Sequence, residues 1–96
     1  MSEVKERLKA YLKRDKTGMR KELLLLLLQG GKYSSSEIQD FLKSKGYEVS
    51  QKGVSAMIGF IGSRLGIIKS DGIEKRRYFL KKEYVQMVKE IVESNL

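Results

Sequence analysis

Six consecutive leucines, Leu23 to Leu28, constrain the fold of this chain more than any other feature. A chain of 96 residues has room for one modest core, so a run this apolar is expected at its centre. Periodicity alone does not separate a buried strand from a buried helix here. Leucine favours helices, however, and the charged residues 20–22 come directly before the run. We therefore predict a helix from about Met19 to Gln29 that is apolar on all sides and ends at Gly30-Gly31.

Helical signals flank this segment on both sides. Apolar residues recur at helical spacing in residues 3–13 and again in 82–94. Ser34 and Glu37 have the spacing of a capping box, which predicts a short helix after them. Ser50 is a second N-cap candidate, and it precedes a helix predicted from Gln51 to Leu65.

A short hairpin is expected next. Gly66 stands where a helix commonly ends, and residues 67–70 form a strand candidate. Asp71-Gly72 is a hairpin signal, and Arg77 to Leu80 is the returning strand, with Tyr78 and Leu80 on one face. The predicted fold class is therefore mainly α with a small β-hairpin (α+β), in a single domain over residues 1–96.

The composition argues against catalysis and metal binding. The chain contains neither Cys nor His, so thiolate sites, the commonest metal ligand and the commonest general base are all missing. We expect no enzyme, no metal, no cofactor and no small-molecule ligand. No apolar run approaches the roughly 20 residues of a membrane span, and the N-terminus is charged from Glu3 onward, so we expect a cytoplasmic protein without a membrane partner.

The net charge of +8 favours a polyanionic partner, and it is unevenly distributed. Residues 1–32 carry nine basic and four acidic groups, and residues 67–82 carry six and two. The basic run between Lys5 and Lys21 is interpreted first as the solvated side of a helix. A DNA-contacting arm is the alternative, and binding to a membrane surface is the weakest reading, because the apolar stripe is short.

Residues Tyr33 to Leu80 resemble small prokaryotic, in particular archaeal, winged helix-turn-helix DNA-binding proteins, many of which have no assigned role. The resemblance lies in the order and spacing of four segments: Ser34-Ser35-Ser36-Glu37-Ile38; Val49-Ser50-Gln51-Lys52-Gly53-Val54-Ser55 followed by Ile58 and Ile61; Leu65-Gly66-Ile67-Ile68; and Arg76-Arg77-Tyr78-Phe79-Leu80. It implies a winged-helix core over residues 19–80, with extra helices at 3–13 and 82–94. It also implies that the protein regulates transcription by binding duplex DNA.

On this resemblance the helix from Gln51 to Leu65 enters the major groove, and the hairpin is the wing. At about 100° per residue, its outward face carries Lys52, Ser55, Ala56, Gly59 and Ser63. Few of these side chains read bases, so we expect limited sequence preference. The predicted DNA-binding residues are Ser34, Gln51, Lys52, Ser55, Ser63, Lys75, Arg76 and Arg77.

Several alternatives remain open at this stage. Lys75, Arg76 and Arg77 either contact phosphates or only keep a hairpin edge soluble. Gly59 and Gly62 weaken a helix, which fits close approach of DNA, a packed partner helix, or tolerance beside Phe60. The alternative function is a winged-helix module that binds another protein. RNA binding is a weaker third reading, because no row of exposed aromatic residues is evident.

The terminal helices predict a homodimer. Both carry apolar stripes, whereas the leucine helix already closes the predicted core, and monomers seldom leave such patches in water. The residues expected at the dimer interface are Leu8, Tyr11, Leu12, Tyr84, Val88 and Ile91. The opposite outcome is that both helices fold back on their own core.

Overall fold

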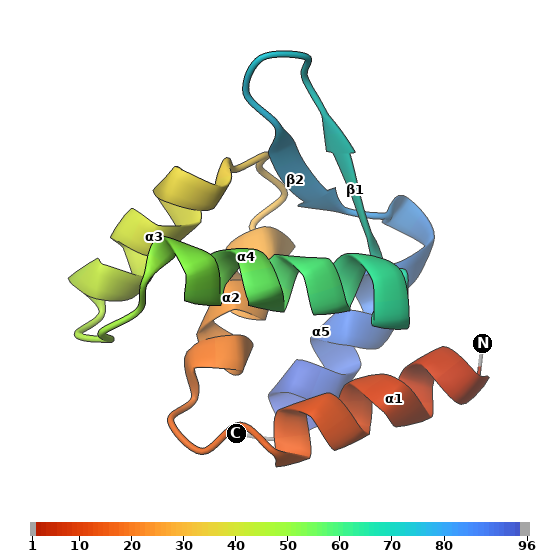
Figure 1. The fold of residues 1–96 in the computed structure, drawn as a ribbon. Helices are drawn as coiled ribbons and strands as arrows, with labels where there is room; N and C mark the ends of the chain where they lie inside the picture. Colours follow the sequence, from red (N-terminus) through yellow and green to blue (C-terminus); the bar gives the residue numbers. More distant parts are fainter. Residues whose placement is uncertain (1, 95–96) are drawn as a thin grey trace.

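The computed structural model describes residues 2–94 as five helices and one hairpin (Figure 1). The elements in chain order are α1 (Ser2–Lys13), α2 (Met19–Leu28), α3 (Ser35–Ser44), α4 (Gln51–Phe60), a π-helical turn (Ile61–Leu65), β1 (Ile68–Asp71), β2 (Arg77–Leu80), a 3-10 turn (Lys82–Tyr84) and α5 (Val85–Ser94). The mainly helical class with a small hairpin is thus confirmed.

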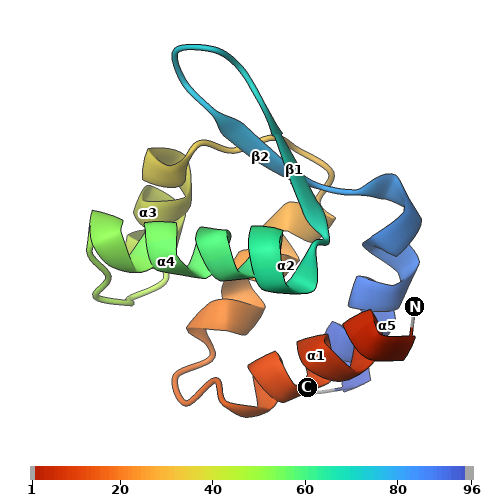
Figure 2. The same cartoon turned by 45° about the vertical axis from the view of Figure 1, so that its right-hand side comes forward.

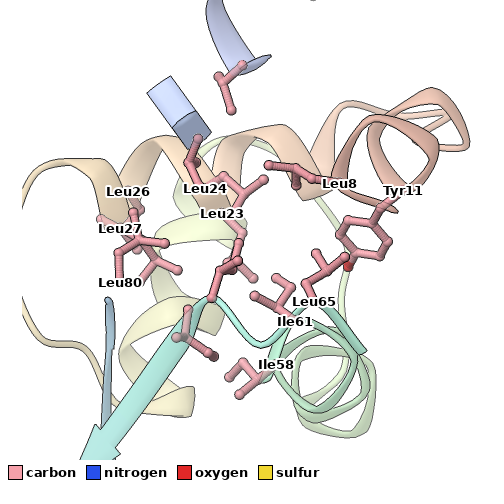
Figure 3. Close-up of a cluster of buried hydrophobic side chains, with 14 of the residues drawn as sticks. Leu8, Tyr11, Leu23, Leu24, Leu26, Leu27, Ile58, Ile61, Leu65 and Leu80 are labelled. Atoms are coloured by element: carbon pink, nitrogen blue, oxygen red, sulfur yellow. The ribbon is translucent and has the colours of Figure 1, made fainter. Parts of the chain in front are cut away.

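The leucine run forms α2 and lies at the centre of the core (Figure 3). Leu23, Leu24, Leu26 and Leu27 are buried, and the other two leucines of the run are partly buried. Helix α2 contacts α3, α5 and β2, so neighbours surround it on several sides. A helix that is apolar all round can be stable only in such a position.

Local signals set the starts of α3 and α4 as predicted. Ser34 and Glu37 form a complete capping box, in which each side chain binds the backbone N–H of the other residue. The Ser50 hydroxyl accepts a hydrogen bond from the backbone N–H of Gly53 at 3.0 Å. After α4 the chain widens into the π-helical turn, which ends at Gly66 in the left-handed conformation (φ 65°).

The hairpin projects away from the helical body in both views (Figures 1 and 2). Its strands are antiparallel, with Ile68 opposite Leu80 and Asp71 opposite Arg77. Residues 72–76 therefore form a longer loop than the two-residue turn that Asp71-Gly72 would allow on its own. Gly72 is required in this loop, because its φ is +97° and a β-carbon there would collide with the carbonyl of Lys75.

The terminal helices pack on the core of their own chain, at the end of the molecule opposite the hairpin (Figure 2). Five of the six residues predicted to form a dimer interface are buried here: Leu8, Tyr11, Leu12, Val88 and Ile91. Tyr84 is partly buried against the same cluster. The predicted interface is therefore wrong. Because α2 is apolar on every side, α5 is needed to cover the surface that α3 and β2 leave open, and α1 packs on α5.

Within residues 2–94, none of the helices combines the length and the apolar character that crossing a membrane requires.

The role of α5 as a core helix can be tested with a matched pair of substitutions. Val88 is fully buried and Val85, one turn earlier, is 37% exposed. Val88→Asp should destabilise the fold by at least about 4 kcal/mol, because it buries an unpaired charge. Val85→Asp should change the free energy of unfolding by less than about 1 kcal/mol. Urea unfolding followed by circular dichroism measures both. If the Val88→Asp protein stayed folded and changed only its oligomeric state, the prediction of a dimer interface on α5 would be supported after all.

Candidate nucleic-acid interface

Helix α4 presents a buried face to the core and a small, mostly uncharged face to solvent. Val54, Ile58, Ile61 and Leu65 are buried, as their spacing requires. The opposite residues are all exposed: Gln51, Lys52, Ser55, Ala56, Gly59 and Ser63. The Ser63 hydroxyl donates a hydrogen bond to the carbonyl of Gly59 at 2.7 Å. The predicted outward face is therefore in the predicted place, and Lys52 is the one cation among these six residues.

A groove of about 510 Å³ separates α4 from the hairpin. Its helix side is formed by Ser55, Gly59 and Gly62, and its hairpin side includes Lys69 and Arg76. The structure thus brings Ser55 and Arg76, which sequence reasoning selected separately, to one surface. Lys69 was missed, although the alternation of strand residues would have placed its side chain opposite that of buried Ile68.

Four cations of the hairpin are exposed, and Glu37 interacts electrostatically with two of them, Lys75 and Arg77, without forming an ion pair. Lys69, Lys75, Arg76 and Arg77 form no ion pair with any carboxylate among the described residues. Asp71 does not offset them directly, because it pairs with Lys32 at 2.6 Å. The hairpin therefore offers positive charge beside the groove, where an anionic polymer has access to it.

The packing of the chain requires neither Gly59 on α4 nor Gly62 in the π-helical turn that follows it. A β-carbon at Gly59 would meet nothing within 4 Å, and one at Gly62 would make only an ordinary contact with Ile68 at 3.7 Å. The ring of Phe60 stacks on Tyr11, with centroids 4.7 Å apart. Open space at both positions is compatible with tolerance of glycine as well as with close approach of DNA or of a partner helix, so the three alternatives stay open.

Ser34 has to be removed from the predicted DNA-binding residues. Only 3% of its surface is exposed, and its hydroxyl accepts the Glu37 backbone N–H and lies 3.2 Å from the Ser36 hydroxyl. The Ser34 side chain therefore caps the start of α3. The backbone N–H of Ser34 donates a hydrogen bond to the Glu37 carboxylate at 2.9 Å, and this bond is the main cause of a lowered pKa of Glu37. The Ser34 side chain and the positive charges of Arg77 and Lys75 lower that pKa further. The Glu37 carboxylate therefore interacts electrostatically with the positive charges of the hairpin.

Sequence reasoning missed a second basic surface, on the other flank of α4. There Arg7, Arg14 and Arg20 gather around the stacked rings of Tyr11 and Phe60. These residues come from three different helices, and no local sequence pattern connects them. Burial raises the pKa of Tyr11 above its ordinary value, so its hydroxyl stays protonated and adds no negative charge.

These features define a small, mainly helical α+β protein with a basic antiparallel hairpin beside an exposed helix. The chain belongs to the family described as "Protein of unknown function (DUF2551)", which matches residues 8–88. It is also similar to a protein of Archaeoglobus fulgidus that is described as "Uncharacterized protein". The two are 55% identical over 91 residues, which cover 95% of this chain and 94% of the relative. No solved structure matches the chain.

The capping box at α3 predicts a pH-dependent loss of stability. Ser34→Ala should destabilise the fold by about 1 kcal/mol near neutral pH and raise the pKa of Glu37. A carboxyl group whose pKa is lower in the folded state stabilises the fold above its ordinary pKa of 4.5. That contribution disappears as the pH falls through the lowered value. The difference between wild type and Ser34→Ala should therefore shrink below about pH 4.5.

Urea unfolding at neutral and acidic pH measures this difference, and carboxyl NMR gives the pKa of Glu37 directly. Ser36→Ala is the matched control, because Ser36 is exposed and its hydroxyl contacts only that of Ser34. An equal loss of stability in the control would show that the capping box does not hold the start of α3.

Proposed function

We propose that this protein is a winged helix-turn-helix protein that binds duplex DNA in the cytoplasm and regulates transcription. In this proposal α4 enters the major groove and the β1–β2 hairpin is the wing. The observation that carries the proposal is the groove between them, with unpaired hairpin cations on one side and a small helix face on the other. The order of α2, α3, α4 and the hairpin along the chain supports it.

The distribution of charge determines how such a protein would bind. Contacts to phosphate oxygens come from Lys69, Lys75, Arg76 and Arg77, and these contacts position a protein without reading sequence. Direct reading of bases falls to Gln51 and Lys52, because the rest of the outward face is too small. We therefore expect binding that depends strongly on salt and that discriminates only weakly between duplexes.

Fluorescence anisotropy with a random duplex and with the upstream region of the gene, each at two salt concentrations, tests the proposal. Affinity for both duplexes should fall steeply as salt increases, because binding releases counterions from the phosphates. Absence of binding to any duplex at low salt would reject it. Binding of another protein with little salt dependence would instead favour an interaction module.

The contribution of the hairpin can be isolated by removing two of its charges. Arg76→Ala with Arg77→Ala should weaken binding to all duplexes by similar factors and reduce the slope of log K against log salt by about 1 per lost phosphate contact. Lys43→Ala with Lys89→Ala is the control, because it removes the same charge from exposed positions on α3 and α5. Equal losses in both double variants would mean that net charge alone determines affinity.

Gly59 offers a test of close approach to the α4 backbone. Gly59→Ala should raise the free energy of unfolding by about 0.5–1 kcal/mol, because alanine is the better helix former and nothing blocks its β-carbon. Gly59→Leu should fold equally well but bind duplex DNA at least tenfold more weakly, because its side chain fills the groove. Ala56→Leu places the same group elsewhere on the exposed face for comparison. Unchanged affinity in Gly59→Leu would rule out DNA in this groove.

A further inference from the structure

A stack of three side chains lies on the flank of α4 that faces away from the hairpin. The rings of Tyr11 and Phe60 stack with centroids 4.7 Å apart and planes inclined by 11°. The Arg20 guanidinium lies 4.2 Å from the centroid of the Tyr11 ring. Because Phe60 and Arg20 are too large to share one face of Tyr11, Tyr11 lies between them. Phe60 is then the open end of the stack, and 39% of its surface is exposed.

Arginines surround this open end. One hollow of about 350 Å³ is lined by Arg7, Arg14 and Arg20, and a second of about 470 Å³ is lined by Arg7 and Arg64. Phe60 lines both hollows, and neither is lined by an Asp or Glu residue. We refer to these four arginines together with Tyr11 and Phe60 as the arginine cleft. Both hollows fall within the roughly 300–1,000 Å³ that is typical of small-molecule sites.

One carboxylate, that of Asp15, lies close to the cleft: it acts electrostatically on Tyr11, and its oxygens accept the backbone N–H groups of Arg20 and Lys21 at 3.2 and 3.0 Å. None of the four guanidinium groups forms an ion pair with it or with any other carboxylate among the described residues. Two are instead held by backbone carbonyl groups: Arg20 donates to the carbonyl of Tyr11 at 2.8 Å, and Arg7 to that of Arg64 at 3.3 Å. Fixed guanidinium groups that repel one another are well prepared to bind an anion, and their geometry suits phosphate.

Lysines on another face of α1 provide a contrast within the same helix. Lys9 and Lys13 line a hollow that also contains Glu6 and has no aromatic residue. The basic groups of α1 are therefore not all equivalent. Of these two surfaces of α1, the arginine cleft is the one that combines an excess of positive charge with an exposed aromatic ring.

We propose that the arginine cleft binds a nucleotide, with the base stacked on Phe60 and the phosphate held by the arginines. An aromatic ring beside an arginine cluster matches both halves of such a ligand, whereas inorganic phosphate would leave Phe60 unused. The site goes beyond the proposed binding of duplex DNA, because none of its lining residues lines the groove beside the hairpin, although Ser63 of the outward face borders its second hollow. A ligand bound there contacts the same helix that borders the groove.

Isothermal titration calorimetry of the full chain tests this with three probes: adenosine monophosphate, ribose 5-phosphate and adenosine. We expect the complete nucleotide to bind, and each half alone to bind at least tenfold more weakly. Phe60→Leu keeps an apolar side chain but should weaken nucleotide binding about 5- to 150-fold, the range expected for loss of base stacking. Phe60→Tyr should retain binding. Circular dichroism checks that each variant is folded.

A charge-matched pair of double variants completes the test. Arg7→Gln with Arg14→Gln should weaken binding of both the nucleotide and ribose 5-phosphate at least tenfold. Lys9→Gln with Lys13→Gln removes the same charge from the same helix and should leave binding unchanged. Equal losses in the two pairs would overturn the proposal, because general attraction would then explain the binding. No heat of binding with adenosine monophosphate would overturn it as well.

Duplex DNA binding by the same variants separates this site from the proposed function. If the nucleotide does not bind but the Arg7 and Arg14 pair loses affinity for duplex DNA, the cleft is part of the DNA interface and the nucleotide proposal is wrong. If the nucleotide binds and duplex DNA does not, the proposed DNA-binding function is rejected and the proposal of a nucleotide site in the arginine cleft is supported. A short single strand that binds more tightly than the mononucleotide, with the same dependence on Phe60, identifies a strand as the source of the ligand and supports the same chemistry.

Discussion

Burial of the α2 leucines on every side is the constraint on which the rest of the fold depends. Each fully buried leucine contributes about 1.5–3 kcal/mol relative to exposure, so leaving one side of α2 open would be costly. Helix α5 covers the side of α2 that α3 and the hairpin do not, and α1 packs in turn against α5 and the π-helical turn after α4. This arrangement uses the apolar stripes of both terminal helices within one chain. It also leaves the outer face of α4 uncovered, which is what any partner of this helix needs.

Helix α4 itself carries little charge and divides two basic surfaces that other elements supply. Its residues Ser55 and Gly59, with Gly62 of the following π-helical turn, lie toward the hairpin, and Met57 and Phe60 lie toward α1. The cations come from the hairpin on one flank and mainly from α1 and α2 on the other. Helix α4 therefore contributes shape and a stacking ring, whereas its neighbours contribute the electrostatic attraction.

The features that the sequence predicted correctly all depend on a few adjacent residues. The pair of Ser34 and Glu37 begins α3, Ser50 begins α4, and Gly66 ends the turn that follows. The apolar stripes were also identified correctly, but a stripe indicates only that a face is buried and not what covers it. For that reason the apolar stripes of the terminal helices were wrongly predicted to form a dimer interface.

The arginine cleft could not be predicted, for a related reason. Arg7 and Arg20 are far from Phe60 and Arg64 in sequence, and the four come together only when α1 packs against the π-helical turn after α4 and Tyr11 stacks on Phe60. Before the packing was known, the basic residues of α1 were read together as one solvated face. The structure separates them, because Arg7 and Arg14 point toward an aromatic stack and Lys9 and Lys13 line a different hollow.

The two basic surfaces also differ in how firmly their charges are held, and this difference fits the two kinds of ligand proposed for them. The hairpin cations are exposed and form no ion pair among the described residues, so their long side chains can adjust to an extended phosphate backbone. In the arginine cleft, carbonyl groups hold Arg7 and Arg20, and the Tyr11 ring lies between Arg20 and Phe60. A small ligand makes few contacts, so it gains most from groups that are already ordered before it binds. An extended polymer makes many contacts, and each of its cations can be less precisely placed.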